Sequence, residues 1–296
     1  MAESNPKPGL FEHLVKRHPC FNDEAHFQYG RIHLPVSPAC NIQCRFCQRG
    51  FNKWEQRPGV SRKLLRPDEA VQMVGRALQV CPEITVVGIA GPGDTLATDH
   101  ALTVFEQVHR YFPQLVKCLS TNGLLLAEKA ERLNKAGVQT VTVTVNSLDE
   151  RVLPKICSQV VVNQQVLQDE DAARALIAAQ KDGIKRMADL GAVIKINTVL
   201  IPGINDHCLA EIAAVTAGLG ASRMNIIPLI PQHEFQNWPA PDCQQLNSAR
   251  ILAEKHLAVF RHCKHCRADA CGIPGTGREI SEELYEHSIP MTFSHG

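Results

Sequence analysis

The sequence predicts an α/β fold, a partial, TIM-like barrel of six βα units with an extension at each end. Six short apolar, β-branched runs have lengths typical of buried strands: 31–36, 84–89, 115–119, 140–145, 193–199 and 224–228. Amphipathic helical patterns lie between most of these runs. Such alternation implies right-handed crossovers and a parallel sheet. Six strands suit an open or partial barrel better than a closed eightfold one.

Local patterns indicate where the helices between the strands begin and end. Pro67 and Asp68 occupy capping positions ahead of an apolar stripe that starts at Ala70. A second stripe covers residues 101–108, and a third ends at Gly137, where a C-cap glycine belongs. Chemistry in such barrels is expected at the carboxyl ends of the strands.

The alternation divides the chain into three predicted segments. Residues 1–30 form an N-terminal extension, residues 31–238 the barrel, and residues 239–296 a C-terminal extension. We expect both extensions to cap the barrel, because they fall outside the strand and helix pattern.

Composition excludes several classes of protein. The 296 residues are 44% hydrophobic and 21% charged, which fits a globular enzyme rather than a disordered chain. A net charge of +1 with scattered Lys and Arg predicts no nucleic-acid partner. No run approaches the ~18 apolar residues of a membrane span, and the polar N-terminus lacks the apolar stretch of a secretory signal. We therefore expect a cytoplasmic protein, whose 12 cysteines serve as thiols or metal ligands rather than disulfides.

A cysteine triplet with C-x3-C-x2-C spacing follows the first predicted strand, at Cys40, Cys44 and Cys47. Three thiolates on a cubane iron-sulfur cluster leave one iron open to an exogenous ligand. The alternatives are a zinc knuckle or accidental clustering. The spacing, with Phe46 before the last cysteine, resembles the radical S-adenosylmethionine superfamily. That resemblance implies a barrel of the superfamily's type, a catalytic 4Fe-4S cluster on the triplet, and S-adenosylmethionine chelating the open iron.

Further positions are candidates for binding S-adenosylmethionine. Glycines after the second strand let the backbone approach a ligand, and Asp94 can accept from an ammonium group. This segment resembles the superfamily's glycine-rich segment, although an ordinary βα turn would look the same. Polar residues at the end of the fourth strand can meet ribose or carboxylate, and residues on the last two strands can wall the adenine, although each suits plain core as well. The candidates are Gly91, Gly93, Asp94, Thr144, Asn146, Ser147, Ile196 and Asn225.

Cysteines also stand near both ends of the chain. Cys263 and Cys266 form a C-x2-C pair in the C-terminal extension, and Cys20 lies in the N-terminal one. These three thiolates can meet over the barrel mouth and hold another iron-sulfur cluster. A zinc site with a nearby histidine is the alternative.

Motifs along nearly the whole chain resemble the NifB family in matching order. They are His18-Pro19-Cys20, Glu24-Ala25-His26, the run 31–36, the triplet with Asn41-Ile42, the run 57–60, Gly88 to Asp94, Cys118 to Gly123, Pro202 to His207 and His262 to Ala270. The segment after Ala270 is too short for the NifX-like domain of some members, so we expect none. The resemblance implies the form without it.

The resemblance implies three 4Fe-4S clusters: one catalytic on the triplet, a second on Cys20, Cys263 and Cys266, and a third using His33 and Cys118. The last two would be substrates. The resemblance implies that these two clusters are fused around a carbon from the methyl group of S-adenosylmethionine, with an added sulfur, into the eight-iron precursor of nitrogenase iron-molybdenum cofactor. The implied partners are a cluster-donating iron-sulfur assembly protein, an electron donor, and a NifX- or NifEN-like carrier or scaffold.

One position departs from the family pattern. Trp54 stands where a cysteine usually precedes the acidic residue and Arg-Pro-Gly, so Glu55 or a spare cysteine is left to complete the third cluster. Two rival functions follow. One is another radical S-adenosylmethionine enzyme with an auxiliary cluster that acts on a peptide or small molecule. The other is a non-catalytic iron-sulfur carrier, which would not need the segment Gly91 to Asp94. The unassigned cysteines are Cys81, Cys157, Cys208, Cys243 and Cys271.

Overall fold

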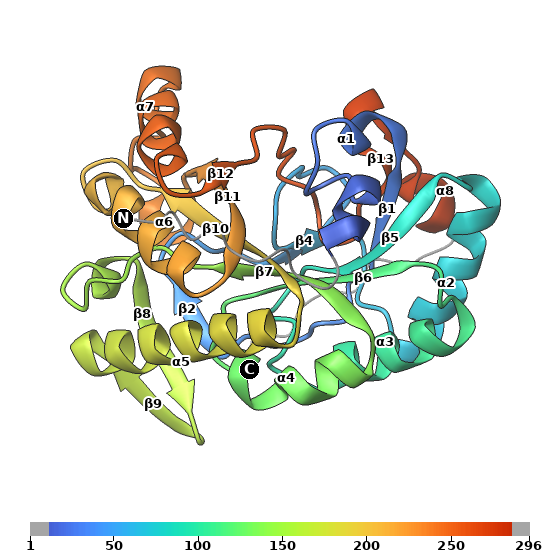
Figure 1. Ribbon diagram of the computed structural model, residues 1–296, viewed down its shortest axis with the longest axis horizontal. Helices are drawn as coiled ribbons and strands as arrows, with labels where there is room; N and C mark the ends of the chain where they lie inside the picture. The colour runs from blue at the N-terminus through green and yellow to red at the C-terminus, as the bar shows by residue number, and fades with distance from the viewer. Residues whose placement is uncertain (1–11, 286–296) are drawn as a thin grey trace, which may run out of the picture.

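A nine-stranded sheet forms the centre of the molecule in the computed structural model, which describes residues 12–285 (Figure 1). Six neighbouring strands pair in parallel, as the sequence predicts. In sheet order they are β1 (Gly30–His33), β5 (Ile84–Ile89), β6 (Val116–Thr121), β7 (Val138–Thr144), β10 (Val193–Leu200) and β11 (Ala221–Pro228). The predicted partial barrel is confirmed.

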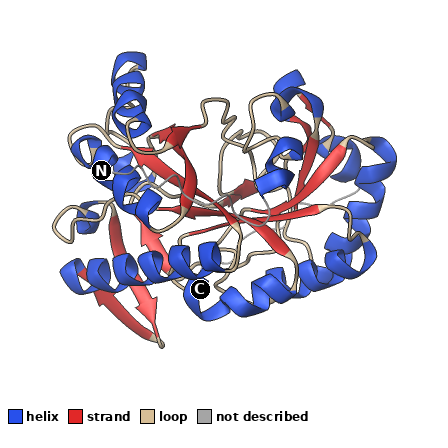
Figure 2. Ribbon diagram, in the orientation of Figure 1, coloured by secondary structure: helices blue, strands red, loops and turns tan. Residues whose placement is uncertain are grey.

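Amphipathic helices follow the strands and pack outside the sheet (Figure 2). In α2, which begins at Pro67, the Glu69 side chain accepts from the Arg66 amide at 2.9 Å. The third predicted helix ends just before Gly137, whose φ of 75° suits glycine. The helices are α2 (Pro67–Val80), α3 (His100–Tyr111), α4 (Leu126–Lys135), α5 (Asp169–Asp189) and α6 (Leu209–Gly218).

The chain after residue 238 adds strands to both edges of the sheet, which the sequence did not predict. After α7 (Cys243–Glu254), β12 (Ala258–Val259) pairs in parallel with β11. At the other edge β13 (Cys271–Ile273) runs antiparallel to β1, and β14 (Arg278–Glu279) pairs with β13. Strands of two or three residues are too short to show a period. The C-terminal segment therefore crosses the barrel mouth from one edge to the other (Figure 1).

Smaller elements lie outside the nine-stranded sheet. A three-stranded sheet joins β2 (Ile42–Cys44), β8 (Cys157–Val162) and β9 (Gln165–Gln168), and β3 (Gly50–Phe51) pairs with β4 (Val60–Ser61). Two short helices, α1 (Ala25–Gln28) and α8 (Ser281–Tyr285), belong to the two end segments. The outermost eleven residues of each predicted extension lie outside the described residues.

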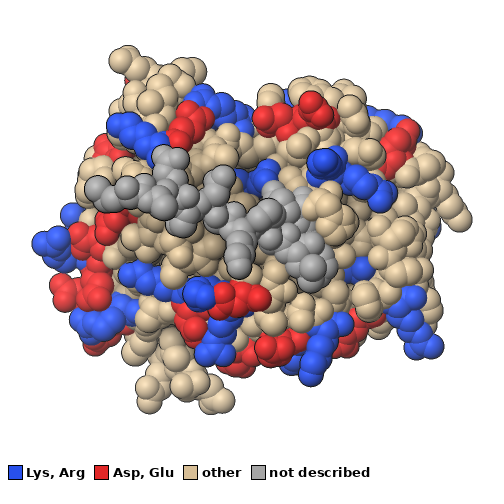
Figure 3. All heavy atoms as spheres, viewed as in Figure 1, with Lys and Arg blue, Asp and Glu red and all other residues tan. Residues whose placement is uncertain are grey.

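The helices and one face of the described residues show how apolar and charged side chains are distributed. Within residues 12–285, no helix is long and apolar enough to cross a membrane. Lys and Arg are interspersed with Asp and Glu over the described residues on the face in Figure 3. This mixture agrees with the net charge of +1.

Candidate iron-sulfur and S-adenosylmethionine site

All eight side chains predicted as iron ligands line one cavity at the carboxyl ends of the parallel strands. They come from both end segments, the triplet loop, β1 and β6. They are Cys20, His33, Cys40, Cys44, Cys47, Cys118, Cys263 and Cys266. The fold thus gathers residues from nearly the whole length of the chain around one space.

The triplet loop, residues 37–47, rests on the glycine-rich segment after β5. The Gly93 amide donates to the Ser37 carbonyl at 2.8 Å, and the Asp94 amide donates to the Ala39 carbonyl at 2.9 Å. A Cβ at Gly93 would lie 2.0 Å from the Ala39 oxygen, so only glycine allows this approach. The loop that presents Cys40 is therefore positioned by backbone contacts with the next strand's loop.

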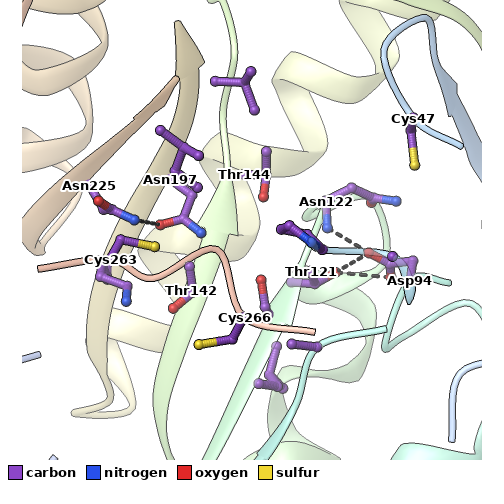
Figure 4. A pocket seen from close by; sticks show the side chains of 18 of the residues that line it. Cys47, Asp94, Thr121, Asn122, Thr142, Thr144, Asn197, Asn225, Cys263 and Cys266 are labelled. Atoms are coloured by element: carbon purple, nitrogen blue, oxygen red, sulfur yellow. Dashed lines mark hydrogen bonds between the residues drawn. The ribbon is translucent and has the colours of Figure 1, made fainter. Parts of the chain in front are cut away.

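Asp94 is buried beneath the loop after β6 (Figure 4). The Thr121 hydroxyl lies 3.0 Å from both carboxylate oxygens of Asp94. The backbone N–H groups of Asn122 and Leu96 donate to the same carboxylate at 2.6 and 2.9 Å. Burial raises the pKa of the Asp94 carboxyl, and the bonds from Asn122 and Leu96 oppose that rise. These contacts use most of its acceptor capacity. Asp94 therefore organises the two loops, and its predicted contact with an ammonium group stays a prediction.

Two other residues near the triplet were not assigned from the sequence. The Asn122 side chain donates to Asn41 Oδ1 at 2.7 Å and lies 4.0 Å from Cys40 Sγ. Cys157 pairs with Cys44 across β8 and β2 and also lines the cavity. The sequence could have indicated Asn122, because it follows the end of the strand that carries Cys118. It could not have indicated Cys157, because only strand pairing brings this residue to the triplet loop.

Burial keeps the triplet thiols protonated when no metal is bound. It raises the pKa of Cys40 to about 11 and also raises that of Cys47. For Cys44 the hydrogen bond with Cys157 is the largest cause of the increase, followed by burial. Metal binding at these positions must displace protons.

The side walls of the cavity include part of the predicted polar surface but not Ile196, Ser147 or Gly91. Thr144, Asn146 and Asn225 line the cavity, and Figure 4 shows Thr144 and Asn225 facing it. Ile196 does not, because it is fully buried in the hydrophobic core. Ser147 does not either: its hydroxyl lies 3.4 Å from the Asp149 carbonyl and 3.8 Å from Cys208 Sγ.

Register explains why Ile196 points away from the cavity. Ile196 pairs with Val143, whereas Asn197 pairs with both Thr144 and Asn225. Directly paired residues point to the same side of a sheet, so Asn197 takes the place predicted for Ile196.

Gly91 also lies outside the cavity; its φ is 119°, and a Cβ there would lie 3.4 Å from Ala268 Cβ.

The polar wall fits a ligand with N–H or O–H groups. The Asn225 side chain donates to Asn197 Oδ1 at 3.2 Å, while its own Oδ1 is buried without a hydrogen-bond partner among residues 12–285. A buried acceptor of this kind needs a donor. The amine, ribose and adenine groups of S-adenosylmethionine are such donors, so the wall fits that cofactor beside a cluster-binding loop.

The tail site, which we define as Cys20, Cys263 and Cys266, lies among buried cations. Arg31 Nη2 donates to Cys266 Sγ at 3.3 Å, and Lys195 Nζ donates to the Cys20 carbonyl at 2.9 Å. Burial raises the pKa of Cys20 to about 12, and the charge of Lys195 opposes the rise. Positive charges at buried thiols favour an anionic occupant.

The hydrogen bond of the His33 ring is compatible with its predicted role as an iron ligand. Its Nδ1 lies 3.2 Å from the Arg267 carbonyl, which fixes the proton on Nδ1 and leaves the Nε2 lone pair available. Burial is the largest cause that lowers the His33 pKa to about 4, so the ring is neutral. A Cβ at Gly88 would lie 2.9 Å from Cδ2, so that glycine makes room for the ring.

The candidates for completing the third cluster are not all at the cavity. Trp54 is 78% exposed, and Glu55 bonds to Arg57 at 2.9 Å and to Asn52; neither lines the cavity. Of the five unassigned cysteines, only Cys157 does. Arg267 holds the Glu55 and Asn52 carbonyls at 2.6 and 2.7 Å, so this loop is tied to the C-terminal segment.

Single-ion sites are absent from the described part of the chain. In residues 12–285, no three His, Cys, Asp or Glu side chains gather closely enough to hold one metal ion. In a cubane cluster each thiolate binds a different iron, so its ligands need not meet at one point. The donor set of cysteines around an open cavity fits clusters of this kind.

The sequence and fold match proteins already known. Residues 34–215 match the model of the radical SAM superfamily. FeMo cofactor biosynthesis protein NifB of Methanocaldococcus infernus is 44% identical over 95% of this chain and 93% of its own length. NifB of Methanocaldococcus jannaschii is 43% identical with the same coverage. NifB of Klebsiella pneumoniae is 41% identical over 94% of this chain, but the match spans 61% of that protein.

Solved structures support the fold alone. A radical SAM methyltransferase from Sphaerobacter thermophilus superposes with a TM-score of 0.54 at 18% identity, over 78% of this chain and 65% of that one. Methylornithine synthase (PylB) gives a TM-score of 0.54 at 12% identity, over 83% and 67%. The superfamily match, the whole-chain similarity and the triplet at the barrel mouth together show that this chain belongs to the NifB family of radical SAM enzymes.

Proposed function

We propose that this protein fuses two 4Fe-4S clusters, with a methyl-derived carbide and an added sulfur, into the eight-iron precursor of nitrogenase iron-molybdenum cofactor. The relatives' names assign them to FeMo cofactor biosynthesis. The observation that carries the proposal is the single cavity lined by all eight expected ligands. Fusion requires two substrate clusters and a methyl donor within reach of one another. A shared cavity meets that requirement.

The triplet loop would hold the catalytic cluster. Cys40, Cys44 and Cys47 would bind three irons of a 4Fe-4S cluster, which when bound supplies an open iron for chelating and reductively cleaving S-adenosylmethionine. Gly93 and Asp94 keep the loop in place through backbone bonds. Thr144, Asn146 and Asn225 would contact the polar parts of the cofactor.

Side chains across the cavity would hold the two substrate clusters. Cys20, Cys263 and Cys266 would bind one, and His33 and Cys118 the other. Both substrates are anionic when ligated by thiolates. Arg31 and Lys195, each at most 6% exposed, place positive charge beside them. Charges act strongly in a buried site, so these cations support binding of anionic clusters.

The proposed reaction implies partner proteins and assigns a role to each segment of the chain. A cluster-donating assembly protein, an electron donor and a carrier or scaffold for the product would be needed. Residues 31–238 would supply the catalytic barrel, and the segments 1–30 and 239–296 would supply substrate ligands.

Anaerobic reconstitution tests the proposal. The full chain would be loaded with iron and sulfide, its iron counted, and the products of S-adenosylmethionine measured. We expect about twelve irons per chain, from three cubanes, and both 5′-deoxyadenosine and S-adenosylhomocysteine. Four or eight irons without S-adenosylhomocysteine would sink the proposal. Omitting iron from the reconstitution is the matched control.

A second candidate function has one observation in its favour. Trp54 is exposed and Glu55 lies outside the cavity, which leaves His33 and Cys118 as the anchors of a third cluster. A radical S-adenosylmethionine enzyme with one auxiliary cluster, acting on a peptide or small molecule, would need no third cluster. About eight irons and 5′-deoxyadenosine alone would favour this alternative.

A further inference from the structure

His18 lines the cavity two residues before Cys20 and has no role so far. The residue is 1% exposed, and its Nε2 has no hydrogen-bond partner among the described residues. A buried polar atom without a partner costs free energy. Its position on the cavity wall indicates that a bound molecule supplies the partner.

The proton of the His18 ring is on Nε2. The Cys20 backbone amide donates to Nδ1 at 3.1 Å, so Nδ1 is an acceptor. An imidazole nitrogen that accepts a hydrogen bond carries no proton, so the ring is the tautomer with an N–H donor at Nε2. His18 offers the cavity a proton rather than a lone pair.

Two neighbouring histidines have the opposite arrangement. Nδ1 of His26 lies 2.8 Å from the Pro19 carbonyl, and Nδ1 of His33 lies 3.2 Å from the Arg267 carbonyl. Both rings therefore donate from Nδ1 and keep a lone pair on Nε2. His33 suits an iron atom, whereas His18 suits an electron-rich acceptor.

Packing holds the His18 ring in place. The centroid of the His18 ring lies 4.3 Å from the centroid of the Phe21 ring. Lys195 Nζ lies 4.4 Å from the same Phe21 centroid and so helps to hold Phe21. The ring is thus fixed by Phe21 on one side and by the Cys20 amide at Nδ1. A preoriented donor of this kind loses little entropy when its acceptor binds.

We propose that His18 Nε2–H donates a hydrogen bond to a sulfide of the substrate cluster anchored by His33 and Cys118, an inference that rests on the proposed function. His18, His33 and Cys118 line the same cavity, and Cys118 packs against the apolar cluster that contains Phe21, the residue in contact with the His18 ring. Hydrogen bonds to cluster sulfur raise the reduction potential. The bond would also help hold a cluster that has few protein ligands.

Two substitutions separate the roles of the two ring nitrogens. His18→Asn keeps an oxygen near the Nδ1 position, where it can accept from the Cys20 amide, but removes the donor at the Nε2 position. His18→Gln places an amide N–H near the Nε2 position and removes the Nδ1 acceptor. A purely structural role for the Nδ1 bond would make Gln the more damaging change.

The measurements use the full chain with Cys44→Ala and Cys263→Ala, so that the third cluster gives the main signal. After anaerobic reconstitution, the midpoint potential and the rate of iron loss to a chelator would be compared. For His18→Asn we expect a more negative midpoint and roughly tenfold faster iron loss, and for His18→Gln values close to the parent.

The outcomes distinguish this inference from the proposed function. An unchanged potential and rate in His18→Asn, or a larger change in His18→Gln, would overturn the role of Nε2. A parent that takes up no cluster on His33 and Cys118 would overturn the proposed function, and this inference with it. Circular dichroism of each variant identifies loss of folding.

A third variant, His18→Lys, restores an N–H donor by another side chain and should recover the parent potential.

Discussion

The triplet loop and the tail site line the same cavity but are held in different ways. The triplet loop is positioned by the backbone amides of Gly93 and Asp94. At the tail site, residues from both ends of the chain meet beside the charged side chains of Arg31 and Lys195. A loop held by backbone bonds keeps its geometry, whereas chain ends adjust more readily. The first arrangement suits a cluster that is retained, and the second a cluster that is consumed.

The largest expected effect comes from breaking the triplet. Cys44→Ala should remove about four irons and abolish 5′-deoxyadenosine formation, because two thiolates cannot hold the catalytic cluster open for S-adenosylmethionine. Product analysis by chromatography measures the effect. Cys243→Ala is the matched control, since Cys243 is exposed and does not line the cavity. Continued cleavage in Cys44→Ala would contradict the assignment of the triplet.

Breaking the tail site should separate two products. Cys263→Ala should remove about four irons but leave uncoupled formation of 5′-deoxyadenosine, because the triplet loop does not depend on that thiol. Precursor formation should stop. Iron counting and product analysis on the same sample test this. Equal loss of cleavage in both cysteine variants would mean that the two sites are one functional unit.

The backbone contact that positions the triplet loop can be tested without removing any cluster ligand. Gly93→Ala should lower the free energy of unfolding by on the order of 3 kcal/mol and impair iron uptake at the triplet, because the added Cβ would collide with the Ala39 carbonyl. Chemical denaturation and iron analysis measure both effects. In the control Gly218→Ala, a Cβ meets nothing within 4 Å, so we expect a change below about 1 kcal/mol. Similar values for the two variants would argue against the close approach.

The smallest effect is expected at Trp54. Its side chain is 78% exposed and does not line the cavity. Trp54→Phe should therefore leave the iron count unchanged and alter the free energy of unfolding by less than about 0.5 kcal/mol. Parallel iron analysis and denaturation of the parent and variant suffice. A loss of iron would show that this loop closes over a cluster.

Strand and helix positions were largely predictable, because each barrel element carries its own pattern. The predicted run 84–89 coincides with β5, and the others overlap their strands. The two-residue strand β12 and the antiparallel β13 were not predictable, because their pairing depends on the far ends of the chain meeting the sheet. The choice between Ile196 and Asn197 was equally hidden, because the period of two does not say which face of a strand meets the cavity.

The sequence by itself determined the family and supplied the candidate ligands, because spacing such as that of Cys40, Cys44 and Cys47 is a local property of the chain. Tertiary structure decided which groups share the cavity. It placed Cys157 beside Cys44, directed Asp94 to Thr121 and Asn122, and brought Arg31 to Cys266. These contacts join residues far apart in the chain, and their burial, tautomers and charges exist only once the sheet and both end segments have packed together.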